Sequence, residues 1–184
     1  MKKVYPYTIE NSIGERIIFE KLVQEPDGDR LLVENFVVPG SGPVMHTHLL
    51  QDEVLTVVKG KMGYQVLGQP KRYAGEGETV VFKKGTPHNF WNEGNEILNC
   101  KGYIKPANTF EFFISSIFDA QNKTGTAKPA AFDAAYLLTR YSKEYEMVGI
   151  PSLVKKVIIP VTYQLGKLLG KYKKFKDAPA PVVK

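Results

Sequence analysis

The chain has 184 residues, of which 43% are hydrophobic and 24% are charged, and it contains one cysteine, Cys100. This composition is ordinary for a globular protein and excludes a disordered or fibrous chain. One cysteine cannot form an internal disulfide, and no apolar run follows the two N-terminal lysines, so no secretory signal is predicted and we expect a cytoplasmic protein.

The net charge of +6 is unevenly distributed along the chain. Residues 151–184 carry eight lysines and one acid, Asp177, whereas the residues before them are close to neutral. The arginines are scattered, and no nucleic-acid-binding motif is recognisable in the sequence. We therefore expect no nucleic-acid partner.

Residues 1–105 show a succession of short strand patterns. The segments are rich in β-branched and aromatic residues, and turn sequences rich in glycine, proline and aspartate separate them; they cover residues 16–23, 30–38, 53–60, 63–68 and 96–104. Many short strands joined by glycine-rich turns predict an all-β sandwich or barrel over residues 1–105.

Residues 106–176 show helical spacing instead. Helices are predicted over 109–121, over 130–149 with Gly149 as a stop signal, and over 152–175 with a kink at Pro160. We expect this region to be a helical extension packed on the barrel or on a partner subunit, with residues 177–184 as a frayed tail.

The last predicted helix has more apolar residues than one narrow stripe requires. Its longest uncharged stretch, 157–166, is far shorter than the ~20 residues of a membrane span. Burial against the barrel or a second subunit is the favoured interpretation, which predicts a homodimer. The alternative is a lysine-flanked helix lying on an anionic membrane surface, although terminal lysines also merely solvate a helix end.

The three histidines of the chain are His46, His48 and His88. His46 and His48 are two residues apart in an apolar stretch, so on a strand they project to the same side. Unpaired imidazoles in a core are unfavourable, and a metal ion that takes a lone pair from each ring removes that penalty. Glu53 follows after enough residues to turn a corner and start the adjacent strand, and His88 begins a later strand-like run, although Asp52 could replace Glu53.

Three imidazoles and one carboxylate form a mixed nitrogen–oxygen ligand set. Such a set suits one divalent transition metal (Fe, Mn, Ni, Cu or Zn) rather than Ca or Mg. Four protein ligands on a six-coordinate ion leave two positions open, as a catalytic metal requires. The predicted metal ligands are His46, His48, Glu53 and His88.

The same stretch resembles the cupin family. Its first motif, G(X)5HXH(X)3–4E(X)6G, is matched by Gly40, His46, His48, Glu53 and Gly60. Its second motif, G(X)5PXG(X)2H(X)3N, is matched by Gly77, Gly85, His88 and Asn92, with Lys83 in place of the proline. The resemblance covers about residues 30–105 and implies a double-stranded β-helix, or jelly-roll barrel, with the metal inside its mouth.

The resemblance also suggests a function. It implies a mononuclear non-heme metal dioxygenase, similar to the quercetinase-like small cupins, in which Glu53 shifts between metal ligand and general base. Phe90 shares its strand side with His88, so it is a candidate wall of a substrate pocket or simply a packing residue. No arginine lies in the motif strands, which favours a small apolar, aromatic or enolic substrate. Two alternatives remain open: a non-catalytic binding or sensory module, and a metal-dependent isomerase or epimerase.

Overall fold

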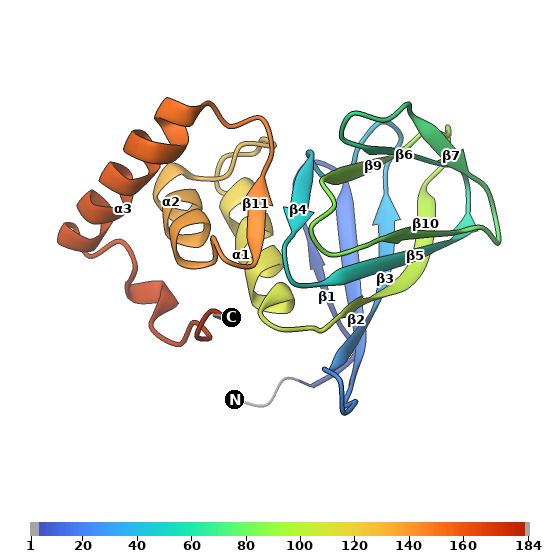
Figure 1. Ribbon diagram of the computed structural model, residues 1–184, viewed down its shortest axis with the longest axis horizontal. Helices are drawn as coiled ribbons and strands as arrows, with labels where there is room; N and C mark the ends of the chain where they lie inside the picture. The colour runs from blue at the N-terminus through green and yellow to red at the C-terminus, as the bar shows by residue number, and fades with distance from the viewer. Residues whose placement is uncertain (1–3, 183–184) are drawn as a thin grey trace.

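Two antiparallel β-sheets form the barrel that the strand pattern predicts (Figure 1). The computed structural model describes residues 4–182. The larger sheet has the order β1 (Tyr7–Glu10), β2 (Glu15–Val23), β3 (Arg30–Val37), β10 (Leu98–Lys105), β5 (Asp52–Lys59), β8 (Thr79–Phe82). The smaller sheet has the order β11 (Tyr145–Met147), β4 (His46–His48), β9 (His88–Asn92), β6 (Met62–Val66), β7 (Arg72–Ala74). This is the predicted double-stranded β-helix, followed by the predicted C-terminal helices.

Alternation of side chains fills the barrel interior. Every second residue of β3 is buried. Strand β5 alternates in the same way up to its last two residues, which are both exposed. Inward residues of both sheets form an apolar cluster that includes Val37, Leu55, Val57, Met62, Phe82, Phe90, Leu98 and Cys100. Burial of each large side chain contributes about 1.5–3 kcal/mol, so this cluster holds the two sheets together.

The helical extension lies beside the smaller sheet (Figure 1). Helix α1 (Phe110–Asn122) agrees with its prediction, and a second apolar cluster joins this helix to the barrel and to α2 (Ala131–Arg140). Phe113 on α1 stacks on Tyr145 of β11 with ring centroids 4.0 Å apart. No helix in the described part of the chain is long and apolar enough to cross a bilayer.

The prediction of one helix over 130–149 is wrong beyond Arg140. The chain turns there, and β11 pairs antiparallel with β4, placing Tyr145 opposite His48 and Met147 opposite His46. Two backbone hydrogen bonds extend the pairing, from Leu49 to the Glu144 carbonyl (2.8 Å) and from Val148 to the Met45 carbonyl (3.0 Å). The open edge of β4 requires backbone partners, and this requirement outweighs the helical spacing of the sequence.

The last helix is shorter than predicted. A π-helical turn (Val154–Ile158) precedes Pro160, which then lies in the first turn of α3 (Ile159–Leu168), where a missing N–H is tolerated. The helix ends because Gly170 adopts a φ of 64°. The Lys171 N–H then bonds to the Gly166 carbonyl (2.9 Å), and the Gly170 N–H bonds to the Lys167 carbonyl (3.1 Å). The chain reverses into a 3₁₀ turn (Lys173–Phe175) instead of continuing to residue 175 as a helix.

The end of the chain makes specific contacts where we expected a frayed tail. The Tyr141 hydroxyl donates to the Pro179 carbonyl (2.8 Å), and the Val182 N–H donates to Glu144 Oε1 (2.9 Å). Residues 183–184 of the predicted tail lie outside the described residues. Up to Val182, the tail therefore lies against the helical extension.

Glu144 connects the barrel, α1 and the tail. Its side chain is fully buried, and besides the Val182 N–H it accepts hydrogen bonds from Gln51 Nε2 (3.1 Å) and the Thr109 N–H (3.4 Å). Gln51 Nε2 also lies 3.1 Å from the Tyr145 hydroxyl. One carboxylate thus satisfies donors from three separate segments.

We expect Glu144→Ala to lower the free energy of unfolding by about 3 kcal/mol, because it leaves buried donors without acceptors. Glu146→Ala, two residues further along on β11, is the matched control, since the exposed Glu146–Lys155 pair should contribute less than about 1 kcal/mol. Urea unfolding of both variants measures the difference. Equal losses in the two variants would show that the network does not hold the extension in place.

A second buried polar contact joins the start of β2 to α1. Asn11 Nδ2 donates to Glu15 Oε1 (3.2 Å) and to Gln121 Oε1 (3.0 Å). Burial raises the pKa of Glu15 to about 6, and the hydrogen bond from Asn11 only partly opposes that effect. The folded state therefore favours the protonated form of Glu15.

The elevated pKa of Glu15 makes the free energy of unfolding depend on pH. Because the folded pKa lies above the unfolded one, the stabilising effect is complete below the unfolded pKa and is lost as the pH rises through about 6. We expect Glu15→Gln to remove about 2 kcal/mol of pH-dependent change in unfolding free energy between pH 4 and pH 7. Thermal or urea unfolding across this range measures it, with exposed Glu10→Gln as the control. An unchanged slope in Glu15→Gln would contradict the assignment.

Candidate metal centre

The four predicted ligands come from both sheets of the barrel. His46 and His48 lie on β4, His88 lies on β9 directly opposite His46, and Glu53 lies on β5. The expectation that Glu53 starts the strand adjacent to the histidine pair is incorrect, because β5 belongs to the facing sheet. The carboxylate therefore reaches the imidazoles across the barrel interior, and the site spans the two sheets.

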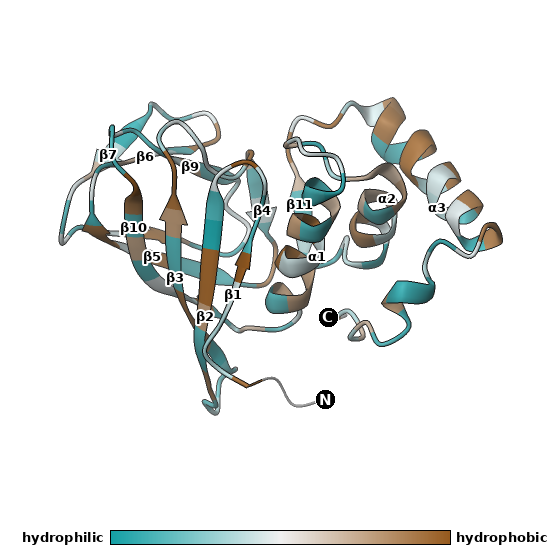
Figure 2. Cartoon of the chain, turned by 180° about the vertical axis from the view of Figure 1, so that it is seen from behind, coloured by the Kyte–Doolittle hydropathy of each residue, from teal (hydrophilic) through white to brown (hydrophobic). Residues whose placement is uncertain are grey.

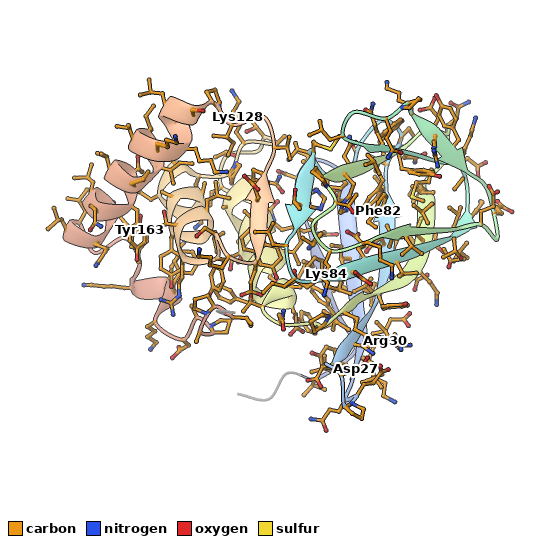
Figure 3. The ribbon with its side chains drawn as sticks, viewed as in Figure 1. Asp27, Arg30, Phe82, Lys84, Lys128 and Tyr163 are labelled. Atoms are coloured by element: carbon orange, nitrogen blue, oxygen red, sulfur yellow. The ribbon has the colours of Figure 1, made fainter. Side chains whose placement is uncertain are left out.

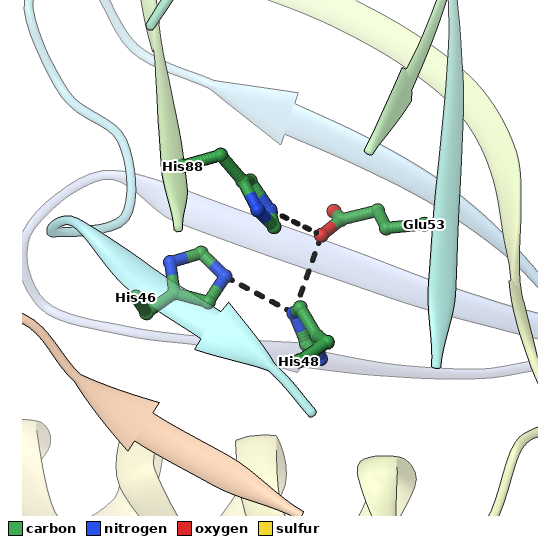
Figure 4. Close-up of side chains that lie close together, drawn as sticks. All are labelled: His46, His48, Glu53 and His88. Atoms are coloured by element: carbon green, nitrogen blue, oxygen red, sulfur yellow. Dashed lines mark hydrogen bonds and ion pairs between the residues drawn. The ribbon is translucent and has the colours of Figure 1, made fainter. Parts of the chain in front are cut away.

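One potential ligand atom from each of these residues lies within 4.8 Å of the others (Figure 4). The Nε2 atoms of His46 and His48 are 3.0 Å apart. Glu53 Oε2 lies 3.1 Å from His88 Nε2 and 3.3 Å from His48 Nε2. The structure thus brings together all four residues that the sequence singles out.

Two of the rings are oriented by backbone carbonyls. His46 Nδ1 lies 2.7 Å from the Val44 carbonyl, and His88 Nδ1 lies 2.8 Å from the Thr86 carbonyl. A carbonyl only accepts, so each Nδ1 carries a proton and donates it. In the neutral rings, the lone pairs of both Nε2 atoms then point into the cluster.

The cluster has more acceptors than donors. The lone pair of His88 Nε2 faces a carboxylate oxygen, and that of His46 Nε2 faces His48 Nε2. A proton on His48 Nε2 can form a good hydrogen bond with either His46 Nε2 or Glu53 Oε2, but not with both. His48 Nδ1 is buried without a hydrogen-bond partner. A divalent cation would accept lone pairs from all four residues at once. The donor set therefore fits a transition metal with mixed nitrogen and oxygen ligands.

The charges of the cluster suit the same conclusion. Burial alone raises the pKa of Glu53, but the adjacent imidazole rings of His48 and His88 outweigh that effect and hold the pKa well below its ordinary value. Burial and then the neighbouring rings of His48 and His88 lower the pKa of His46 to about 3. At neutral pH the site therefore presents an ionised carboxylate and a neutral His46 ring, which are the protonation states that bind a metal.

Aromatic side chains enclose the cluster, and the sequence analysis missed most of them. Phe82 stacks on the His88 ring at 3.9 Å with the planes 7° apart. Phe110, the first residue of α1, and Tyr145 of β11 each lie 5.6 Å from the His48 ring. Phe110 and Tyr145 belong to the helical extension, so the extension covers one side of the site. No signal in the motifs marks these two residues.

Phe90 lies on the same side of β9 as His88, as its position predicts. It is 4% exposed and packs in the barrel cluster with Leu55 and Met62. Its role as a wall of a substrate pocket stays a prediction. Cys100 is buried in the same cluster, and burial raises the pKa of its thiol to about 12, so it is a structural residue rather than a nucleophile.

Asp52 does not join the ligand cluster. Its carboxylate accepts hydrogen bonds from Lys83 Nζ and from the Lys84 N–H, both at 2.8 Å. Lys83 occupies the position where the cupin motif has a proline. Its ion pair with Asp52 links this turn to the start of β5. Gly85, with a φ of 78°, follows it and donates its N–H to the His48 carbonyl (2.7 Å). Among the two adjacent acids, the geometry selects Glu53 for the cluster.

Comparison with known proteins identifies the family. Residues 36–100, which contain all four cluster residues, match the family model of the cupin domain. This part of the chain is a cupin domain, as the motifs and the double-stranded β-helix indicate. No curated protein matches its sequence at a significant level.

Several solved structures are similar to part of the chain. A double-stranded β-helix protein from Klebsiella pneumoniae is 23% identical, with a TM-score of 0.42, over 47% of this chain and 70% of that one. A recombinant oxalate oxidase in complex with glycolate is 20% identical (TM-score 0.45; 54% and 56% covered). An oxalate decarboxylase from Lactobacillus farciminis is 17% identical (TM-score 0.45; 55% and 31% covered). The chain spans less than two thirds of the last two proteins, and likenesses at these scores carry no argument about activity.

We expect His46→Ala together with His48→Ala to weaken metal binding by roughly a hundredfold or more, because half of the ligand set is lost. Protein dialysed against metal-free buffer, with metal content measured by elemental analysis, tests this. Asp52→Asn is the control: it changes an adjacent carboxylate outside the cluster and should retain the metal. Full metal occupancy in a folded double variant would overturn the ligand assignment.

Proposed function

We propose that the protein is a mononuclear non-heme metal enzyme, a dioxygenase acting on a small apolar, aromatic or enolic substrate. The observation that carries this proposal is the convergence of three imidazole nitrogens and the Glu53 carboxylate on one point inside the barrel. His46, His48, Glu53 and His88 would hold the metal. When bound, a metal of this kind supplies Lewis-acid and one-electron redox chemistry.

Glu53 is the candidate group for moving a proton. Its carboxylate is ionised, because the adjacent imidazole rings of His48 and His88 lower its pKa, and the residue is 5% exposed. A phenolic or enolic hydroxyl beside it could lose its proton to this carboxylate, which leaves an anionic substrate oxygen. The same residue would thus serve as ligand and general base.

The surroundings of the cluster favour an apolar substrate. Phe82, Phe110 and Tyr145 contact the imidazole rings and exclude water from them. Arg30 lies at the tip of the β2–β3 hairpin, where it pairs with Glu25 and stacks on Tyr103 (Figure 3). Arg16 stacks on Phe36 of β3, and Arg140 ends α2. None of these three guanidinium groups is positioned to bind a phosphate or dicarboxylate at the cluster.

The alternative is a non-catalytic metal- or ligand-binding module. Two cavities lie away from the cluster, one of about 230 Å³ beside Leu22 and Pro106 and one of about 320 Å³ between β11 and α3. Neither is lined by His46, His48, Glu53 or His88. His46 is the most accessible member of the cluster, so a substrate would approach from its side.

Oxygen consumption tests the proposal. The protein is reconstituted with Fe, Mn, Ni, Cu or Zn, and oxygen uptake is measured with each compound of a panel of phenols and enols. We expect uptake with a redox-active metal and none with Zn. Binding of these compounds without oxygen uptake under any metal would favour the binding module instead.

Glu53→Gln separates the two roles of the carboxylate. We expect kcat per bound metal to fall by roughly a hundredfold, the usual effect of losing a general base, while KM changes far less. Asp52→Asn serves again as the control and should keep kcat within about threefold, because its carboxylate braces a turn outside the cluster. An equal fall in both variants would remove Glu53 from the mechanism.

A further inference from the structure

The last helix exposes an apolar stripe. Leu153, Val157, Val161, Leu165 and Leu168 recur every three or four residues and are between 46% and 84% exposed. Ile158 and Leu169, 49% and 56% exposed, widen the stripe. Figure 2 shows these hydrophobic residues recurring along α3, at the end of the molecule farthest from the barrel. A contiguous apolar surface of this kind marks an interaction site.

The opposite face of the helix already has its packing partners. Tyr163 lies between α3 and α2 (Figure 3), with its ring 6.2 Å from that of Tyr136 and stacked on that of Tyr172 at 5.4 Å. Gly166 on this face is buried, and Tyr172 packs against it. The rotation of the helix is therefore set by its inner face, and the outer stripe is not part of the core. Of the two surfaces that we expected to bury this helix, the barrel does not cover the stripe, and burial on a partner subunit stays a prediction.

Basic side chains surround the stripe. Lys156 and Lys167 are exposed along the helix, and Lys171, Lys173 and Lys176 are exposed in the segment that turns back after it. Asp177 is the one acid in residues 151–184. The segment that carries the apolar stripe is therefore strongly positive, and Lys167, which lies 5.9 Å over the Tyr163 ring, is at the border between the stripe and the inner face.

This charge decides between the candidate partners. In a symmetric contact with a second copy, the same patch lies on both sides, so the lysines of one chain would face those of the other. Like charges placed together across an interface are unfavourable. An anionic bilayer surface instead accepts apolar side chains between its lipids and binds lysines with its headgroups.

We propose that residues 152–169 form an interfacial helix that lies on the surface of an anionic lipid bilayer. The apolar stripe enters the headgroup region and the flanking lysines contact the lipid charges. The helix is too short and too charged to cross the bilayer, so it lies in the plane of the surface. This inference is independent of the reaction at the metal site.

Co-flotation of the full chain with vesicles tests this proposal. We expect binding to vesicles of phosphatidylcholine with about 30% phosphatidylglycerol, weak binding to phosphatidylcholine alone, and weaker binding as salt is raised. Val161→Ser, Leu165→Ser and Leu168→Ser combined should reduce binding to the anionic vesicles by roughly tenfold or more. The control replaces exposed apolar residues of the barrel, Leu67, Val81 and Ile97, with serine and should bind as the unaltered chain does.

A charge variant tests the lysines separately. Lys156→Glu with Lys167→Glu should weaken binding by roughly tenfold or more, whereas Lys21→Glu with Lys128→Glu, at exposed positions elsewhere, should change it little. All four variants should retain the thermal midpoint and metal content of the unaltered chain, because they change only exposed side chains.

Two results would overturn the proposal. One is failure of the folded full chain to float with anionic vesicles, or flotation that the stripe variant does not reduce. The other is a dimer in sedimentation velocity that the stripe variant converts to a monomer while vesicle binding is absent. That second result would assign the stripe to a second copy of the chain.

Discussion

Four lone-pair donors converge on one point inside an apolar barrel. His46, His48 and His88 come from the smaller sheet and Glu53 from the larger one, so the separation of the sheets determines whether the cluster can form. The packing of Phe82 and its neighbours maintains that separation, and the carbonyls of Val44 and Thr86 orient two of the rings. The burial of the surrounding apolar cluster offsets the free-energy cost of placing these polar groups inside the barrel.

The helical extension contributes residues to the surroundings of the metal-ligand cluster. Strand β11 covers the edge of β4, so the histidine strand has backbone partners on both sides, β11 and β9. Phe110 and Tyr145 from the extension contact the His48 ring, and buried Glu144 ties the barrel residue Gln51 to this layer. A cupin barrel without this extension would expose His48 and an unpaired strand edge.

A layer of helices separates two regions of the molecule with different side chains. The inner one is a compact cluster with one ionised carboxylate and aromatic walls, whose donor set fits a metal. The outer one is an apolar stripe bordered by lysines on α3. Their chemistry is distinct, and each can be altered without touching the other, because α1 and α2 lie between them (Figure 1).

Local sequence patterns were sufficient to predict the barrel and the residues of its polar cluster. Strand alternation and turn residues are local properties, so the positions of β2, β3, β5, β6 and β10 follow from the pattern. The spacing of His46, His48, Glu53 and His88 also suffices to propose a metal site, because paired residues on one strand share a side. The tertiary structure confirmed Glu53 rather than the adjacent Asp52, because the Asp52 carboxylate is bound to Lys83 in the turn after β8.

The tertiary structure also decided what happens after residue 140. The apolar spacing of 141–149 is compatible with a helix, but the open edge of β4, about a hundred residues away in the sequence, recruits this segment as β11. Phe110 and Tyr145 became part of the site for the same reason. In the last helix, periodicity shows that apolar residues share a face but not whether anything covers that face. Whether a side chain is buried depends on packing between segments that are distant in the sequence, so a local sequence pattern cannot predict it.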